Sequence, residues 1–332
     1  MNIKTKFLLL IISSLSFKIN AQEIDFGKDL FFLLVNPDAR SNAMGGFGIS
    51  NSNSGNAIFN NFSLSPNLNH KGSLDISYLP TFRESDGRIL SMSGVLKLGT
   101  KHSFGISARH ANYGRIYFTD VNGNSTGYGN PFDYELSVAY GRILNGNFSI
   151  GIRTKYIFSN VATGQQILGI DIKSGKSLAA DFSASYIERL NSDKDKLTLG
   201  LNVANFGSKL SYSDSSEGIN IPFKIGIGGS YERNFSIKWK TILSIGYEYY
   251  FEDIELLEPI WAIGNELTYN NILSFRLGYE RQKVNLNSRN IILIGAGFLI
   301  KSVSIQFAYQ IYPESKIIFF DDHLNLNLGY RF

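Results

Sequence analysis

The sequence contains no cysteine and few charged residues, and each scarcity removes a class of function. Without cysteine, the chain can form no disulfide, no thiolate metal site and no cysteine nucleophile. Charged residues make up 18% of the chain, less than the roughly 25% usual in soluble globular domains. The formal net charge is +4, and three of these charges belong to Lys4, Lys6 and Lys18. The rest of the chain is close to neutral, which gives no electrostatic argument for binding nucleic acid.

Long hydrophobic runs are also lacking, apart from one stretch near the start. Residues 7–17 (FLLLIISSLSF) are apolar, follow Lys4 and Lys6, and precede the small residue Ala21. We interpret residues 1–21 as a cleavable signal peptide, so the mature chain is expected to begin at Gln22. Elsewhere the longest apolar run, residues 291–300, is far shorter than the roughly 18–20 residues of a membrane-spanning helix. We therefore expect an exported protein without helical spans.

The last ten residues (HLNLNLGYRF) alternate between apolar and polar side chains. A strand has a period of two, so this segment presents one apolar and one polar face. A strand that ends at a terminal Phe, here Phe332, is the form that barrel-assembly machinery reads in outer-membrane proteins. This ending favours a membrane barrel over a periplasmic or secreted soluble protein.

The same alternation recurs from residue 72 onward and predicts fourteen antiparallel strands. Most are 10–13 residues long, which matches the 9–11 residues that a tilted membrane strand needs. The even count places both termini on the periplasmic side. We predict an all-β fold, a transmembrane outer-membrane β-barrel over residues 72–332. The expected strands start near residues 72, 88, 101, 132, 147, 178, 195, 221, 238, 260, 272, 289, 302 and 323.

Charges in the middle of these strands fall on the polar face, which would line the lumen of a barrel. A soluble sandwich would show the same pattern with the faces reversed, so the size and the signals at both ends decide for the barrel. The strand at residues 291–299 is apolar on both faces and fits the scheme least. The candidate lumen charges are Glu135, Arg153, Lys155, Glu248 and Arg276.

The links between the expected strands alternate between short and long. Short links are expected to be periplasmic turns and long polar links extracellular loops. The short links include residues 99–100, 144–146 and 270–271. The long links are residues 113–131, 159–177, 207–220, 252–259 and 284–288.

Residues 22–71 do not alternate and are rich in Gly, Asn and Ser. With both ends held near the periplasmic rim, this segment could fold into the lumen as a plug; the alternative is an ordered periplasmic flap. Arg40 and Asp38 could then pair with inward groups such as Glu135, Lys155 or Glu248. The candidate plug residues are Asp38, Arg40, Met44, Gly45 and Gly46.

Residues that could carry catalysis or bind metal are scarce. The chain has four histidines without metal-ligand spacing, and we interpret each as a turn or lumen residue: His70, His102, His110 and His323. Residues 120–124 resemble the start of a calcium loop, but Ser125 and Pro131 stand where the loop needs Gly and Glu. We expect no enzyme, no cofactor and no metal site.

Specific stretches resemble the PorV family (also called LptO), components of the type IX secretion system of Bacteroidetes. Residues 36–46 (NPDARSNAMGG) resemble a segment near the start of family members. The resemblance covers most of residues 30–232 and continues more loosely. One departure is Asn60-Asn61-Phe62, where the family usually carries Trp-Asn-Pro. Further stretches match in order at 116–124 (IYFTDVNGN), 156–160 (YIFSN), 177–181 (SLAAD) and 202–212 (NVANFGSKLSY).

The resemblance implies a barrel similar to the fatty-acid transporter FadL, with fourteen strands and an N-terminal plug. It also implies a role as carrier in secretion. The partners would be the C-terminal signal domains of cargo proteins, the SprA- or Sov-type translocon, the surface sortase or attachment complex, and outer-membrane lipid. A member of the related PorQ branch with another cargo is one alternative. A FadL-like transporter of hydrophobic small molecules is the main rival, and it predicts an apolar pocket above the plug and a kink in the wall.

Overall fold

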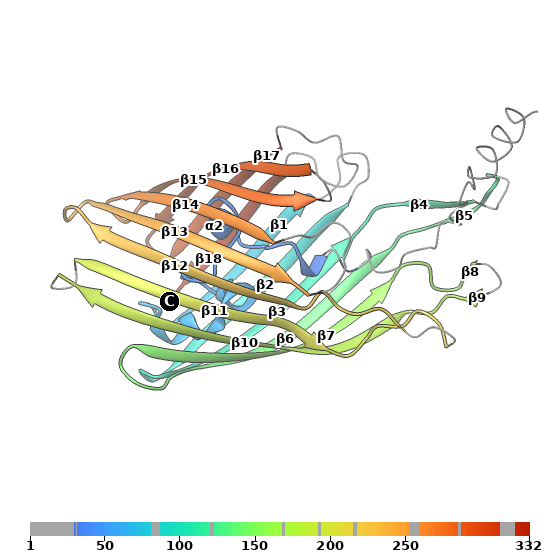
Figure 1. Ribbon diagram of the computed structural model, residues 1–332, viewed down its shortest axis with the longest axis horizontal. Coiled ribbons are helices and arrows are strands. Elements are labelled where there is room, and N and C mark those ends of the chain that lie inside the picture. The colour runs from blue at the N-terminus through green and yellow to red at the C-terminus, as the bar shows by residue number, and fades with distance from the viewer. Residues whose placement is uncertain are drawn as a thin grey trace, which may run out of the picture.

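The chain folds into a closed antiparallel barrel in which fourteen strands each pair with two neighbours (Figure 1). The computed structural model describes residues 30, 32–80, 87–119, 123–167, 170–191, 194–214, 218–251, 259–284, 287–312 and 323–332. The seam between the first and last strands runs from the pair Ser73–Arg331 to the pair Tyr78–Leu326 and closes the cylinder. Among the described residues, no helix has the length and apolar character needed to cross a membrane.

The barrel strands follow one another around the wall in chain order, and short helices precede them. The helices are α2 (Ala39–Asn42), α3 (Ala57–Asn60) and the 3₁₀ helix η2 (Phe62–Asn67). The strands of the wall are β1 (Gly72–Pro80), β2 (Arg88–Leu98), β3 (His102–Asn112), β6 (Phe132–Ile143), β7 (Phe148–Asn160), β10 (Gly175–Leu190), β11 (Asp195–Gly207), β12 (Lys224–Asn234), β13 (Trp239–Tyr250), β14 (Ile260–Tyr269), β15 (Leu273–Val284), β16 (Asn287–Ile300), β17 (Val303–Ile311) and β18 (His323–Arg331).

The two faces of the wall settle the choice between a membrane barrel and a soluble sandwich. Large apolar side chains point outward, as in Ile106 and Leu178, which are 65% and 66% exposed. Polar side chains point inward and are buried, as in Ser103 and Glu135. This is the reverse of a soluble fold, and it is the arrangement required where the outside meets lipid.

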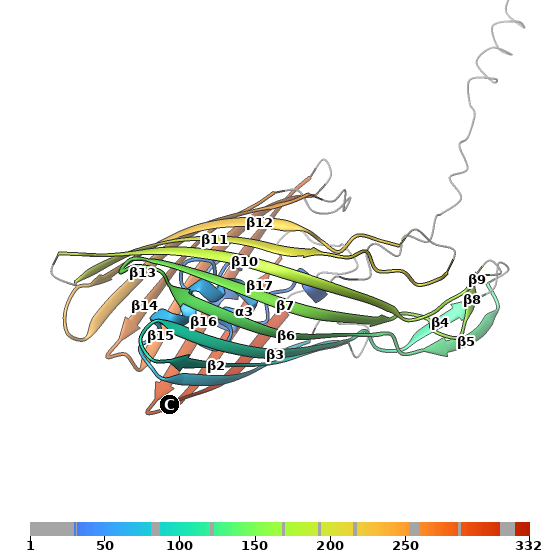
Figure 2. The same cartoon turned by 90° about the horizontal axis from the view of Figure 1, so that it is seen from below.

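The predicted strands are confirmed, with starts that differ by three residues or fewer. Short links gather at one end of the barrel, the turn rim, and long links at the other, the loop rim. Two hairpins within the long links were not predicted: β4 (Ile116–Thr119) with β5 (Ser125–Gly129), and β8 (Gln166–Ile167) with β9 (Ile170–Asp171). Figure 2 shows both hairpins projecting beyond the wall at the loop rim. The predicted signal peptide and residues 120–122 lie outside the described part of the chain.

Residues 36–71, here called the luminal segment, lie inside the barrel. Helix η2 packs against β6, β7 and β10, while α2 packs against β16, β17 and β18. The chain enters from the loop rim, because Leu30 and Phe32 pack against Leu79 and Ile157, which lie near that end of their strands. It leaves at Gly72 on the turn rim. The expectation that both ends of residues 22–71 stay near the periplasmic rim is therefore wrong for the described part.

Inward-facing glycines make room for the luminal segment around most of the wall. A Cβ atom at any of nine positions, each on a different strand, would lie within 3.0 Å of an atom of the segment. At Gly264 it would lie 2.3 Å from the carbonyl oxygen of Met44, and at Gly200 it would lie 2.2 Å from that of Ile49. We call this ring the glycine belt: Gly105, Gly141, Gly151, Gly200, Gly226, Gly246, Gly264, Gly278 and Gly295.

The same packing explains the strand that is apolar on both faces. In β16, Ile292 and Ile294 point outward, while Leu293 points inward and is fully buried. The next inward residue, Gly295, lies against Ala43 of the luminal segment. Ala43, with Ala39, packs on Ala308 of β17. The inner face is apolar here because it meets protein.

A closed barrel should resist unfolding in detergent, because no strand edge is left to begin it. We expect the protein to fractionate with the outer membrane and to migrate differently on a gel before and after boiling. Recovery in the soluble periplasmic fraction, together with a single band under both conditions, would contradict the barrel.

Candidate functional site

The luminal segment begins with a tightly built turn around α2. The Asp38 carboxylate caps the helix by accepting bonds from the backbone N–H groups of Arg40 and Ser41 at 3.2 and 3.3 Å. The chain then reverses at Gly45 and Gly46, whose φ angles of +95° and +82° favour residues without a side chain. This turn accounts for the sequence of residues 38–46: a capping acid, small residues facing the wall, and two glycines at its end.

Arg40 anchors this turn to the wall through a buried triad of charges. Its Nε and Nη2 atoms donate to the two carboxylate oxygens of Glu266 at 2.8 and 2.9 Å. Arg276 donates from Nε to the same carboxylate at 2.6 Å. Burial alone would lower the pKa of the Arg40 guanidinium, but the Glu266 carboxylate raises it above the ordinary value.

The partner of Arg40 corrects the pairing expected from the sequence. Glu135, Lys155 and Glu248 do not bind Arg40; Glu266 does. The turn at Asn270-Asn271 places Glu266 directly opposite Arg276. The register of that hairpin is therefore the sequence signal that could have identified Glu266. Asp38 is likewise used within the segment, where its Oδ2 also accepts from the Ser41 hydroxyl at 2.5 Å.

A second charge network lies on the opposite wall. Asp181 accepts from Arg153 at 3.2 Å and from Lys155 at 2.8 Å. Arg153 also contacts Glu135. Strand register brings these groups together, because Arg153 lies opposite Asp181 across β7 and β10. The five candidate lumen charges thus all face inward, but they divide among separate clusters.

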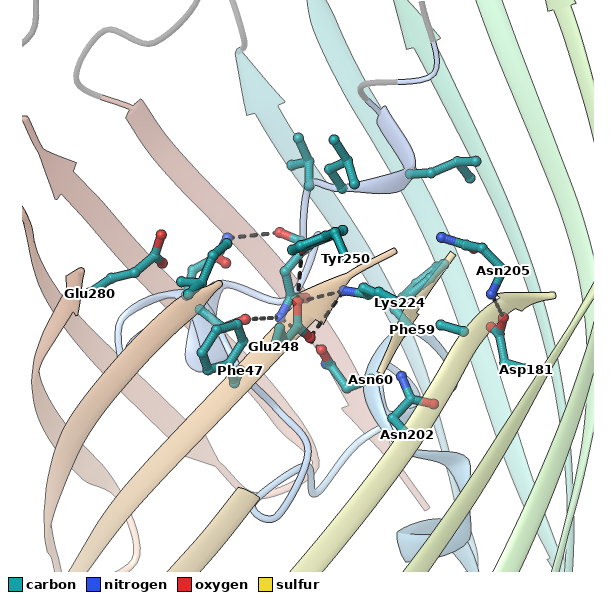
Figure 3. A pocket seen from close by; sticks show the side chains of 18 of the residues that line it. Phe47, Phe59, Asn60, Asp181, Asn202, Asn205, Lys224, Glu248, Tyr250 and Glu280 are labelled. Carbon is teal, nitrogen blue, oxygen red and sulfur yellow. Dashed lines mark hydrogen bonds and ion pairs between the residues drawn. The ribbon is translucent and has the colours of Figure 1, made fainter. Parts of the chain in front are cut away.

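The third cluster contains Glu248, one of the five candidate lumen charges, and two residues that were not among the candidates, Lys224 and Tyr250. Lys224 donates to both oxygens of Glu248, at 3.0 and 2.8 Å. The Tyr250 hydroxyl donates to the same carboxylate at 2.9 Å. Figure 3 shows these side chains converging on one side of a cavity.

The cavity has a volume of about 140 Å³ and separates the second and third clusters. Phe47, Phe59 and Asn60 of the luminal segment contribute to its lining (Figure 3). Residues 33–36, where the chain enters the barrel from the loop rim, also line the cavity. Such a space suits water or a small polar solute, because a hydrocarbon beside buried ion pairs would satisfy none of their hydrogen bonds. The apolar pocket that the transporter rival predicts is not what this lining provides.

The wall behind the cavity carries a bulge at Asn205. The φ angle of this residue is +65°, and the register between β10 and β11 shifts beside it. Its backbone N–H donates to Asp181 at 2.7 Å, and its side-chain amide donates to the carbonyl of Pro222 at 2.6 Å. Asn tolerates left-handed backbone better than most residues, and bulges are common beside functional sites. The strand pattern alone gave no sign of this irregularity.

Arg109 binds residues 32–35, where the chain enters the barrel at the loop rim. It was not recognised as a site residue from the sequence. Its guanidinium donates to the backbone carbonyls of Phe32 and Val35 at 2.5 and 3.1 Å. It also lies 4.7 Å from the ring centre of Phe59. Above it, an apolar cluster joins Leu30, Phe32 and Leu33 to residues of two loop-rim links, including Ile172, Leu210 and Tyr212.

The three histidines whose side chains the structure describes, His70, His102 and His110, form no common site. His110 stacks on Tyr134 on the outer face, so its interpretation as a turn or lumen residue is wrong. His102 shares a hydrogen bond of 2.7 Å with the Tyr140 hydroxyl. Burial, aided by Arg331 and Lys97, lowers the pKa of His70 to about 4, so this side chain is neutral at physiological pH. Within the described ranges, no group of His, Asp and Glu side chains is arranged to hold a metal ion.

Comparison with known proteins gives a family and a fold. A family model described as type IX secretion system protein PorV matches residues 20–251. Among curated proteins, none matches the chain. The chain also resembles solved structures at low sequence identity, and this likeness shows the fold alone.

Three of these structures illustrate the likeness. The toluene transporter TbuX of Ralstonia pickettii has a TM-score of 0.57 and 13% identity, covering 91% of this chain and 100% of its own. The CymD monoaromatic hydrocarbon channel has a TM-score of 0.58 and 12% identity, covering 90% and 98%. A FadL homologue of Pseudomonas aeruginosa has a TM-score of 0.52 and 13% identity, covering 90% and 98%.

Proposed function

The chain belongs to the PorV family of type IX secretion system proteins, and from this premise we propose that it carries cargo proteins during secretion. It is an outer-membrane component of that system, with a FadL-like barrel. In the proposed role, it binds cargo proteins through their C-terminal signal domains. It collects them from the SprA- or Sov-type translocon and delivers them to the surface sortase or attachment complex.

The family match is the observation that carries this proposal, and the loop rim offers a place for the binding. The β4–β5 and β8–β9 hairpins project from one side of the wall (Figure 2). The links beside these hairpins are fixed in place, because Ile172, Leu210 and Tyr212 pack into the apolar cluster around Phe32. A binding surface built on such ordered links loses less conformational entropy when a partner docks.

Transport of hydrophobic small molecules remains the alternative function, and one observation favours it. The wall bulges at Asn205, directly beside the cavity. The charged lining of the cavity argues in the other direction. The names of the hydrocarbon channels describe those proteins, whose identity to this chain is 12–13%.

We further propose that the luminal segment acts as a plug. A carrier of proteins needs no open pore, and a barrel of this width would leak small solutes if its lumen were empty. The triad at Arg40 and the glycine belt both support a segment that stays in place. The proposed plug residues are Asp38, Arg40, Met44, Gly45 and Gly46, and the proposed lumen groups that face the segment are Glu135, Arg153, Lys155, Glu248 and Arg276.

Deleting the gene should leave one or more cargo proteins with C-terminal signal domains in the periplasm. Membrane integrity should be unchanged, and the full-length chain supplied in trans should restore surface display. Fractionation followed by mass spectrometry of the periplasm and the cell surface measures this. Normal display of every such cargo, in a strain that also lacks any second gene of the family, would contradict the carrier role.

A further inference from the structure

Three lysines line a shallow groove on the outer side of the barrel at the loop rim. The groove lies where the links before β10 and after β11 meet. We call it the lysine groove, and its lining residues are Thr163, Lys173, Ser174, Lys176, Lys209 and Ser211.

The backbone fixes the direction of these side chains. The N–H of Lys173 donates to the carbonyl of Tyr212 at 2.7 Å, which sets the two links side by side. Ile172, Leu210 and Tyr212 turn inward and are buried in the apolar cluster. In extended chain, successive side chains point to opposite faces, so Lys173 and Lys209 point outward.

The groove carries more positive than negative charge. Lys173 is paired with Asp214, and both side chains are largely exposed. Lys176 and Lys209 are exposed, and neither forms an ion pair within the described ranges. An exposed ion pair is weak, so Lys173 can exchange Asp214 for another anion at little cost.

Directly below the lysines begins the apolar surface that meets lipid. Lys176 lies opposite Phe158 in the pairing of β10 with β7. The next outward residue of β10 is Leu178, and Phe206 follows on β11; they are 66% and 65% exposed. The groove therefore lies where the head groups of a bilayer meet its acyl chains.

We propose that the lysine groove binds a phosphorylated lipid of the leaflet that meets the loop rim. The phosphates would contact Lys173, Lys176 and Lys209, and the acyl chains would lie along Leu178 and Phe206. Cations placed just above an apolar surface are complementary to an anionic amphiphile, and each lysine near a charged lipid surface strengthens binding. A soluble anion would use the lysines but gain nothing from the apolar surface.

The test uses the full chain in dodecyl maltoside micelles, with diphosphorylated lipid A as the probe and native mass spectrometry or fluorescence titration as the readout. Replacing the three lysines (Lys173→Gln, Lys176→Gln and Lys209→Gln) should weaken binding by roughly a hundredfold. A matched control (Lys101→Gln, Lys194→Gln and Lys238→Gln) removes three exposed lysines at the turn rim and should leave binding unchanged. The heat-dependent gel shift verifies that both variants fold.

A second pair of variants tests the lipid part. Leu178→Asn with Phe206→Asn should weaken lipid A binding at least fivefold without changing its dependence on salt. Inorganic pyrophosphate and polyglutamate should compete poorly. Equal weakening by the two lysine triples, no weakening by the groove triple, or full displacement by pyrophosphate or polyglutamate would overturn the proposal.

Discussion

Removing residues 36–69 should turn a barrel with little or no steady conductance into an open channel in planar bilayers. The side chains of a fourteen-stranded wall cannot fill its lumen by themselves. The luminal segment fills it at the level of the glycine belt, where nine strands leave less than 3.0 Å for a Cβ atom. A large, steady current from the full-length protein would rule out the plug.

A single substitution provides a milder version of this experiment. Gly264→Ala places a methyl group against the backbone of Met44, so the segment or the wall must shift. We expect more frequent transient openings and a lower midpoint of thermal unfolding. Gly229→Ala is the matched control, because its Cβ would face outward with its nearest neighbour, Leu199, at 3.5 Å. Identical recordings from the two variants would show that the belt does not hold the segment in place.

Glu266→Ala should cause the largest loss of stability among single substitutions in the lumen. Glu266 joins Arg40 of the segment to Arg276 of the wall, and all three side chains are buried. Removing the carboxylate leaves two buried guanidinium groups without their counter-ion, which costs about 3–5 kcal/mol in the free energy of unfolding. Denaturant unfolding in lipid vesicles measures this cost.

Two control variants test whether the cost comes from leaving buried charges without a partner. Asp214→Ala breaks the exposed pair with Lys173 and should cost less than about 1 kcal/mol. The triple change Arg40→Met, Glu266→Leu and Arg276→Met removes all the charges of the triad and should recover much of the stability lost in Glu266→Ala. A Glu266→Ala variant as stable as the Asp214→Ala variant would show that the triad does not anchor the segment.

The alternation of side chains was sufficient to predict the wall. Each strand carries its own signal, because lipid on one side and a polar lumen on the other impose a period of two. The two hairpins in the long links could not be predicted in this way, because their two faces are not fixed by lipid on one side and the lumen on the other. The alternation is also weakest in β16, because the inner face of this strand meets Ala43 of the luminal segment.

The contacts of the candidate site were harder to predict, for a physical reason. Arg40 and Glu266 are far apart in the chain, and their meeting depends on how deeply the segment enters the barrel. Composition could show that residues 22–71 form no regular strand, but not which strands of the wall they would contact. Ion pairs between neighbouring strands of the wall were easier to predict. The turns fix the register of the strands, and the register places Glu266 opposite Arg276.

The glycine belt also constrains the order in which the molecule assembles. The segment contacts β6 and β7 through η2, and β16 to β18 through α2, so it touches early and late strands of the wall together. Once the seam between β1 and β18 has formed, the ring of close contacts leaves no side entrance for the segment. We therefore expect the sheet to close around residues that are already inside, because the segment would otherwise have to thread through the finished barrel from one rim to the other. In this view the N-terminal residues occupy the lumen before the last strand closes the wall.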